Sequence, residues 1–297
     1  MSKQPSDKTP GLSADEEQEV HANQPPRAAV LHEIIRSQGD KELERSIAAL
    51  WWSALAAGLS MGLSLMAMGL FYSRLPDHES SQVIASLGYS AGFLAVILAR
   101  QQLFTENTLT AVLPVMTTPT LANLGRLLRL WSVVLFGNLA GTLLVSYVML
   151  NLPIFDSKTD IAFLDVGRKV MENDLGQMFS KGIISGWMIA TMVWMIPSME
   201  NAKLWIILII TYLMALGDFT HIVVGSLEVS YLVWAGEVSW AQFGLDFAIP
   251  TLVGNIIGGS FIFALISHAQ VRSESGTPTA KHSTPNDKAK APPTADR

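Results

Sequence analysis

"LGDFTHIVVGSLE" (residues 216–228) places an acid and a histidine three residues apart inside a long apolar stretch. Asp218 and His221 lie between a glycine and two valines, where the chain carries almost no other charge. An ionisable residue within a membrane segment is costly, so it indicates a functional site by default. We therefore take His221 as the leading functional residue. The alternative is a neutral histidine bonded to a neighbouring carbonyl at a helix break.

The composition of the whole chain supports a membrane setting. Of its 297 residues, 49% are apolar and only 15% are charged, whereas soluble domains carry about 25% charged residues. The charges are concentrated in residues 1–46 and 271–297. This distribution predicts an all-α integral membrane protein with polar tails. The absence of cysteine excludes disulfides, thiol catalysis and cysteine metal sites.

The hydropathy pattern predicts six transmembrane helices, each near the roughly 20 residues that cross hydrocarbon. They are placed at residues 49–72, 83–116, 129–150, 178–199, 203–235 and 246–268. Residues 27–48 are predicted to form an amphipathic surface helix. Residues 1–26 and 269–297 are predicted to be disordered tails, and the Lys and Arg bias places both in the cytoplasm.

A repeat divides the membrane region 49–268 into two halves. "FGNLAGTLL" (136–144) and "VGNIIGGSF" (253–261) carry Gly-Asn pairs about 117 residues apart. The same shift matches "LFTENT" (103–108) with "FTHIVV" (219–224) and puts His221 on Phe104. Three spans in each half predict an inverted repeat (3+3) whose second and fifth helices are broken, the arrangement that marks transporter sites. The alternative is two kinked spans that ordinary helix packing bridges.

The polar residues near the breaks have structural explanations. Asn138 and Asn255 are predicted to hydrogen-bond a broken neighbouring helix. Asp218 is predicted to cap the new half-helix or to pair with Arg100. Arg100 could alternatively pair with Glu106 or attract anions, while Glu106 could face away and cap its own half-helix.

These features together resemble the formate/nitrite transporter family over residues 49–268. They are the six spans, the two breaks, "LFTENT", "FGNLAG", the histidine after the second break and "IPTLVGNIIGG" (249–259). "ARQQLFTENTLTAVLPVM" (99–116) and "GDFTHIVVGS" (217–226) are most similar to its YfdC-like branch. The resemblance implies an aquaporin-like fold and pentamers in the bacterial inner membrane, with a pore for small monovalent anions or their acids in each protomer.

The resemblance also implies roles for individual positions. His221 corresponds to the family's central pore histidine, Thr105 to its threonine in the first break, and Thr220 precedes the histidine. The implied apolar constrictions are formed by Phe93, Phe104 and Val193 on the inner side and by Tyr89, Leu103 and Met214 on the outer side. Three positions depart from the family pattern: Thr220 stands where a Glu is common, and Gly225 and Ala190 stand where an Asn is common. Asn107 adds an amide to the first break.

Three functions remain open from the sequence. The leading one is a passive or proton-coupled pore for small anions or weak acids, in which His221 holds or lends a proton. Glu106 and Asp218 favour a neutral-solute or cation path instead, and the third possibility is a non-conducting membrane scaffold. Common catalytic and nucleotide-binding motifs and metal-binding spacing are absent from the sequence. We therefore expect no enzyme activity, no cofactor or metal, and no nucleic acid partner.

Overall fold

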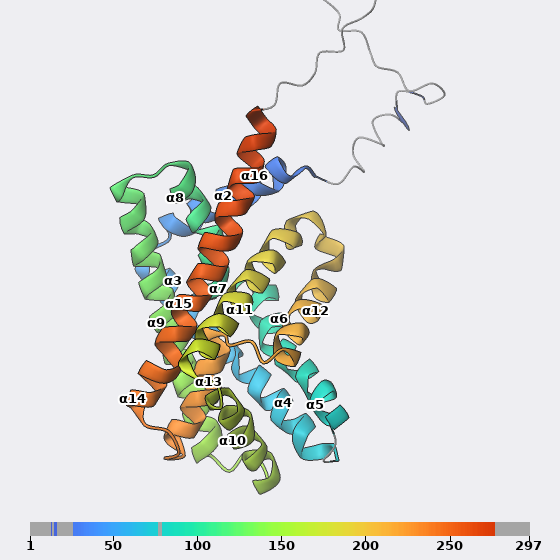
Figure 1. Cartoon of the computed structure of the whole chain (residues 1–297), viewed down its shortest axis with the longest axis vertical. Coiled ribbons are helices and arrows are strands. Elements are labelled where there is room, and N and C mark those ends of the chain that lie inside the picture. Colours follow the sequence, from blue (N-terminus) through green and yellow to red (C-terminus); the bar gives the residue numbers. More distant parts are fainter. Residues whose placement is uncertain (1–12, 14, 17–25, 77–78, 277–297) are drawn as a thin grey trace, which may run out of the picture.

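The computed structural model describes residues 13, 15–16, 26–76 and 79–276. Most of the predicted tails, 1–26 and 269–297, therefore lie outside the described residues. Every regular element in the described part of the chain is a helix (Figure 1), so the predicted all-α class is confirmed. Five helical segments are long and apolar enough to cross a membrane, judged by length and composition: Ile47–Arg74, Ser80–Leu98, Leu121–Asn151, Leu175–Ser198 and Trp240–Ser273.

The chain enters this bundle through α2 (Ala28–Glu44), which ends before Ser46. Ser46 caps the next helix, because its hydroxyl accepts a hydrogen bond from the amide of Ala49. The first long segment consists of α3 (Ile47–Ser60) and α4 (Gly62–Arg74), joined at Met61.

The second and fifth predicted spans are each interrupted. The second contains α5 (Glu79–Ala85), the 3₁₀ turn η1 (Ser86–Tyr89) and α6 (Ser90–Leu98), and after a break α7 (Phe104–Thr110) and α8 (Val112–Thr117). The fifth consists of α12 (Lys203–Leu216) and α13 (Ile222–Trp234), separated by residues 217–221. Neither α12 nor α13 is long enough to span a bilayer alone, at 14 and 13 residues.

Two pairs of long helices frame these segments. α9 (Leu121–Asn151) packs along α3, and α11 (Leu175–Met195) packs along the last long segment. That segment contains α14 (Trp240–Gln242), the π-helical η4 (Phe243–Ala248), α15 (Ile249–Ile256), the π-helical η5 (Ile257–Ala264) and α16 (Leu265–Gly276). Two short 3₁₀ turns, η2 (Ile196–Ser198) and η3 (Glu200–Ala202), link α11 to α12. Glycines allow the close approach: a Cβ on Gly137 would lie 2.6 Å from that of Ala54.

One helix was missed by the sequence analysis. Residues 151–177 lie between the third and fourth predicted spans, where no helix was predicted, but Ser157–Met171 form α10. Asp156 caps this helix by accepting a hydrogen bond of 2.8 Å from the amide of Thr159. α10 packs on α4 and α13. Its sequence is amphipathic and less hydrophobic than the spans, so the hydropathy pattern did not indicate it.

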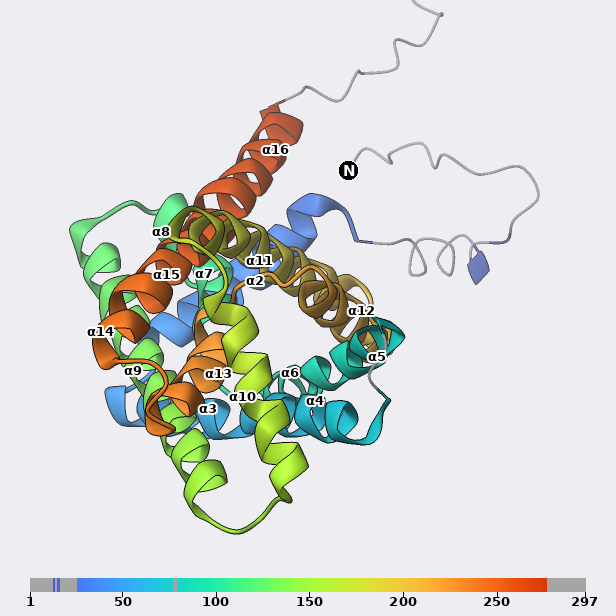
Figure 2. The same cartoon turned by 60° about the horizontal axis from the view of Figure 1, so that its bottom comes forward.

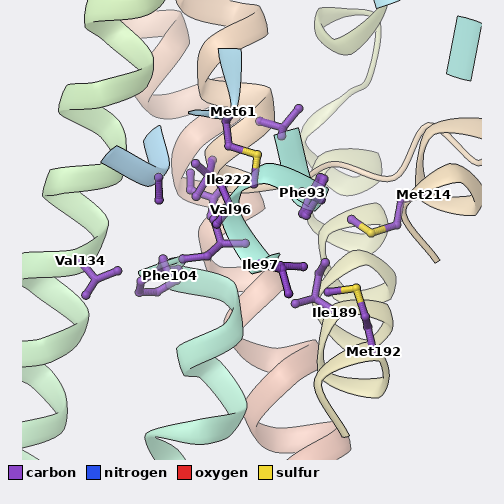
Figure 3. Packing of buried hydrophobic residues seen from close by; sticks show 14 of the residues in the cluster. Met61, Phe93, Val96, Ile97, Phe104, Val134, Ile189, Met192, Met214 and Ile222 are labelled. Carbon is purple, nitrogen blue, oxygen red and sulfur yellow. The ribbon is translucent and has the colours of Figure 1, made fainter. Parts of the chain in front are cut away.

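The interior is built around α13, and all residues of Ile222–Val233 are buried. Viewed along the bundle in Figure 2, this half-helix is surrounded by other helices, and α9, α10 and α4 pack directly against it. Buried apolar side chains from both halves meet around the breaks, among them Phe93, Phe104, Met214 and Ile222 (Figure 3). The two breaks therefore lie within a packed, apolar interior.

Candidate functional site

Two buried asparagines hold the two breaks. The side-chain Oδ1 of Asn138 accepts a hydrogen bond from the amide of Phe104 at 2.9 Å, and its Nδ2 donates to the carbonyls of Ala54 and Gln102 at 2.8 Å. Asn138 on α9 thus pairs with the first amide of α7, that of Phe104, and with the carbonyl of Gln102 in the break before it. Without such partners these groups would be left unpaired in an apolar interior.

Asn255 on α15 makes the same set of bonds at the second break. Its Oδ1 accepts from the amide of Ile222 at 2.9 Å, and its Nδ2 donates to the carbonyls of Gly182 and Thr220 at 2.9 and 3.1 Å. Ile222 is therefore the counterpart of Phe104, and His221 that of Leu103. The sequence-based shift, which put His221 on Phe104, was wrong by one residue. It was set by the distance between the two Gly-Asn pairs, and the starts of α7 and α13 are one residue further apart than those pairs.

Both breaks begin with a residue in the left-handed region. Arg100 has φ 54° and Asp218 has φ 50°. The predicted roles of Asp218 are not observed, because its carboxylate pairs with Lys169 on α10 at 2.6 Å and His221 occupies the capping position of α13. The predicted cap by Glu106 is also wrong: Leu103 is the N-cap of α7, and Glu106 lies within its first turn.

The strained φ at Arg100 gives a testable prediction. Arg100 is exposed, and an ordinary side chain in the left-handed region costs about 1–2 kcal/mol, while asparagine adopts it more readily. We expect Arg100→Asn to raise the thermal stability of the protein in detergent by up to about 1 kcal/mol. Arg100→Val should lower it, because a β-branched side chain fits the left-handed region less well than arginine does. Equal melting temperatures for the two variants would contradict this backbone conformation.

The side chain of His221 joins the two breaks. Its Nδ1 accepts hydrogen bonds of 3.3 Å from the amides of Val223 and Val224, and its Nε2 lies 2.7 Å from the hydroxyl of Thr105. Because Nδ1 serves as an acceptor, the ring is neutral with its proton on Nε2, which donates to Thr105. The ring of Phe93 packs edge-on against the imidazole, with the centroids 5.2 Å apart.

A cavity of about 510 Å³ reaches His221. Residues of α4, η1, α10, α12, α13 and the second break line it. Four further predicted residues take part in this lining: Tyr89, Met214, Asp218 and Thr220. The hydroxyl of Thr220 donates to the carbonyl of Met178 on α11 at 2.8 Å.

Other predicted positions lie away from the cavity. Phe93, Leu103, Phe104 and Val193 are buried in the apolar core, and Phe104 packs against Trp131 with centroids 5.8 Å apart. Asn107 donates to the carbonyl of Leu103 at 3.1 Å. It also donates to the side chain of Gln102 at 3.0 Å.

Three polar residues of the site were missed from the sequence. Gln102 donates to the carboxylate of Glu42 on α2 at 2.8 Å, which ties the first break to α2. Lys169 lies on α10, in a segment where no helix was predicted, and pairs with Asp218. Glu228 is the last letter of the stretch quoted above and lines the cavity; its spacing of seven residues from His221, which places both on one helix face, was the signal that could have found it.

α10 is fixed beside the cavity by ion pairs at its C-terminal end. Arg168 donates to both carboxylate oxygens of Glu237, at 2.8 and 2.5 Å, and to Asp165 at 2.7 Å. The hydrogen bonds from Arg168 hold the pKa of Glu237 below its usual value. This contact links α10 to the turn that follows α13 and so keeps Lys169 beside Asp218.

Comparison with known proteins places this architecture. The family model of the formate/nitrite transporters matches residues 29–269. The chain belongs to the formate/nitrite transporter family. It is thus a member of a family of membrane transporters and channels, and its five long apolar helices agree with that membership.

Several relatives of the family are similar to this chain. Inner membrane protein YfdC of Escherichia coli is 56% identical over 250 residues, which cover 84% of this chain and 81% of the relative. The formate channel FocA of Haemophilus influenzae is 24% identical over 234 residues, covering 69% and 81%. A solved pentameric formate channel with formate bound has a TM-score of 0.66 at 19% identity, covering 76% of this chain and 98% of the channel. This structural likeness shows a shared fold.

Proposed function

We propose that this chain forms a path for small monovalent anions, such as formate or nitrite, or for their conjugate weak acids, through each protomer. The observation that carries the proposal is the contact between the two breaks, where His221 and Thr105 meet at the end of a cavity. Broken helices are tolerated in a membrane where they line a cavity, and their paired breaks mark the substrate sites of transporters. The family relatives named as formate channels add support.

The proposed path belongs to a six-span inverted repeat of 3+3 helices. Its support is the matching set of hydrogen bonds that Asn138 and Asn255 make at the two breaks. α12 and α13 would together form the fifth span. We further propose that the protein is a pentamer in the bacterial inner membrane with both termini in the cytoplasm. The pentameric state of the solved formate channel and the name of the E. coli relative support the first two points.

The charge distribution at the breaks favours an anion over a cation. α13 begins at Ile222 and α7 at Phe104, so the N-terminal ends of both half-helices lie at the His221–Thr105 contact. The N-terminus of a helix carries a partial positive charge, which stabilises an anion. In this proposal the inner apolar constriction is formed by Phe93, Phe104 and Val193. The outer one is formed by Tyr89, Leu103 and Met214.

An ion that crosses an apolar constriction must lose its water. The cost of moving a bare carboxylate into an apolar medium is large, and protonation of the carboxylate removes most of it. The hydroxyl of Thr105, which accepts a hydrogen bond from Nε2 of His221, can in turn donate a hydrogen bond to a substrate oxygen. The pair thus offers a polar contact between two apolar regions.

A cation or neutral-solute path is the second candidate. Its support is the acidic side of the cavity, where Asp218 and Glu228 lie close to His221 in the sequence and line the same space. Asp218 is already paired with Lys169.

Solute flux separates the candidates. We expect liposomes containing the purified protein to take up labelled formate, and unlabelled nitrite or acetate to compete with it. The matched control is liposomes without protein. Uptake of a labelled cation that anions do not reduce would support the second candidate. No flux of any small solute would leave a membrane scaffold and overturn the proposal.

A further inference from the structure

One acid in the cavity has no role in holding the fold. Glu228 lies on α13 and is only 5% exposed, yet its side chain lines the cavity together with His221 and Gly225. Positions separated by four and seven residues share one face of a helix, so these three form a single row along the cavity wall. The side chain of Glu228 makes no hydrogen bond or ion pair with any residue that the structure describes.

The surroundings leave Glu228 without a counter-ion. Lys169 is bound to Asp218 at 2.6 Å, and Asp165 is bound to Arg168 at 2.7 Å. The titratable and charged groups that face the cavity with Glu228 are Tyr72, Tyr89, Lys158, Asp165, Lys169, Asp218 and His221. An ionised carboxylate that is buried without a partner is costly, so the neutral carboxyl is the form that this site accommodates.

His221 is poorly placed to supply a proton. Its Nδ1 accepts the amides of Val223 and Val224, and its Nε2 is engaged with Thr105. A second proton on Nδ1 would displace both amides and remove the cap of α13. The neutral carboxyl of Glu228 lies in the same cavity, two helical turns or about 10 Å along the axis from His221. Its proton is not engaged in a hydrogen bond with a described residue.

We propose that Glu228 is the proton donor that neutralises a weak-acid anion before the anion passes His221. The anion's oxygen takes the carboxyl proton, so that the O–H bond of Glu228 breaks as the O–H bond of the acid forms. The resulting carboxylate is reprotonated by hydronium from the cavity, so one proton moves with each anion. The substrates are then anions of weak acids, and anions of strong acids, which cannot be protonated, are excluded. This inference rests on the proposed function.

The helices packed against α13 leave the cavity as the space that is open to the side chain of Glu228. A Cβ on Gly167 of α10 would lie 2.6 Å from the carbonyl oxygen of Glu228, so α10 and α13 are in direct backbone contact there. A Cβ on Gly225 would lie 2.6 Å from the ring of Phe247. α10 and η4 thus pack closely against α13 beside Glu228 and Gly225. The cavity is the open space into which the carboxyl can point.

Glu228→Gln tests the inference, because glutamine keeps the shape of the side chain but carries no transferable proton. Full-length protein in liposomes is assayed with labelled formate outside and a pH-sensitive dye inside. We expect the wild type to acidify the interior as formate enters. Glu228→Gln should lose about 100-fold of the uptake rate near neutral pH, the lower end of what a positioned proton donor contributes. The loss should shrink at acid pH, where the neutral acid is already present, and Glu228→Asp should recover part of the rate.

Asp160→Asn is the matched control. Asp160 lies on α10, accepts a hydrogen bond from the hydroxyl of Tyr231 at 3.5 Å and does not line the cavity, so its variant should keep the wild-type pH profile. The inference is overturned if Glu228→Gln conducts formate with the wild-type rate and pH profile, or if this variant no longer assembles, which would make Glu228 structural. It is also overturned if nitrate, the anion of a strong acid, is carried as fast as formate. A wild type that takes up no formate at any pH counts against the proposed function itself.

Discussion

Asn255→Leu is expected to abolish the folded protein. Leucine is close to asparagine in size but removes three hydrogen bonds, to the amide of Ile222 and to the carbonyls of Gly182 and Thr220. The carbonyl of Gly182 keeps its partner within α11, but the amide of Ile222 and the carbonyl of Thr220 are left unpaired. At about 1–3 kcal/mol for each buried unpaired group, the total is about 2–6 kcal/mol. A native protein is typically stable by about 5–15 kcal/mol. We therefore expect little or no monodisperse protein in size-exclusion chromatography, and the same result for Asn138→Leu.

Asn151→Leu is the matched control for both variants. Its amide donates to the carbonyl of Tyr147 at 2.9 Å, but it lies exposed at the end of α9. Surface substitutions usually change stability by less than about 0.5 kcal/mol, so this variant should elute as the wild type does. If Asn255→Leu also eluted normally and melted at the wild-type temperature, the asparagine would not be what holds the break.

Much of the fold could be predicted because lipid imposes simple rules on sequence. Long apolar segments and the repeated Gly-Asn pairs indicated the helices and both interruptions, and His221 stood out as an ionisable residue where hydrocarbon is expected. α10 could not be found in this way, because a helix outside the membrane follows no rule of length or apolarity. Its amphipathic pattern is ordinary for any surface helix.

The contacts within the site were less predictable than its location. Asp218 was expected to cap α13 because aspartate is a common N-cap, whereas the histidine three residues later does so with Nδ1. The partner of Asp218 is Lys169 on α10, a helix that the sequence analysis had not identified. Side-chain partners across 49 residues of chain depend on how helices pack, and hydropathy carries no information about that packing.

His221→Asn should separate the structural role of the histidine from its role in permeation. Asparagine is a good N-cap, so its Oδ1 can replace Nδ1 at the amides of Val223 and Val224. It is too short to reach the hydroxyl of Thr105 as Nε2 does. We expect normal assembly with formate uptake about 5- to 150-fold slower, since a lost hydrogen bond at a buried polar site costs about 1–3 kcal/mol and 1.4 kcal/mol is about a factor of ten.

Two further variants sharpen this test. His221→Phe removes the cap as well, so it should show the same loss of uptake together with about 1 kcal/mol of lost stability. Thr105→Val keeps the shape of the side chain and removes only the hydroxyl that meets Nε2. It should slow uptake without changing the cap of α13. Oligomeric state and melting temperature are measured for each variant alongside flux.

The pH profile distinguishes His221 from Glu228. If Glu228 supplies the proton, the His221 and Thr105 variants should slow uptake by a similar factor at neutral and acid pH, whereas Glu228→Gln should slow it chiefly at neutral pH. A histidine that itself donated the proton would produce the opposite result: His221→Asn would then slow uptake chiefly at neutral pH, and Glu228→Gln would leave the rate close to that of the wild type at both pH values. If His221→Asn leaves both the rate and the pH profile intact, His221 serves only as the cap that starts α13, and the anion path loses its central residue.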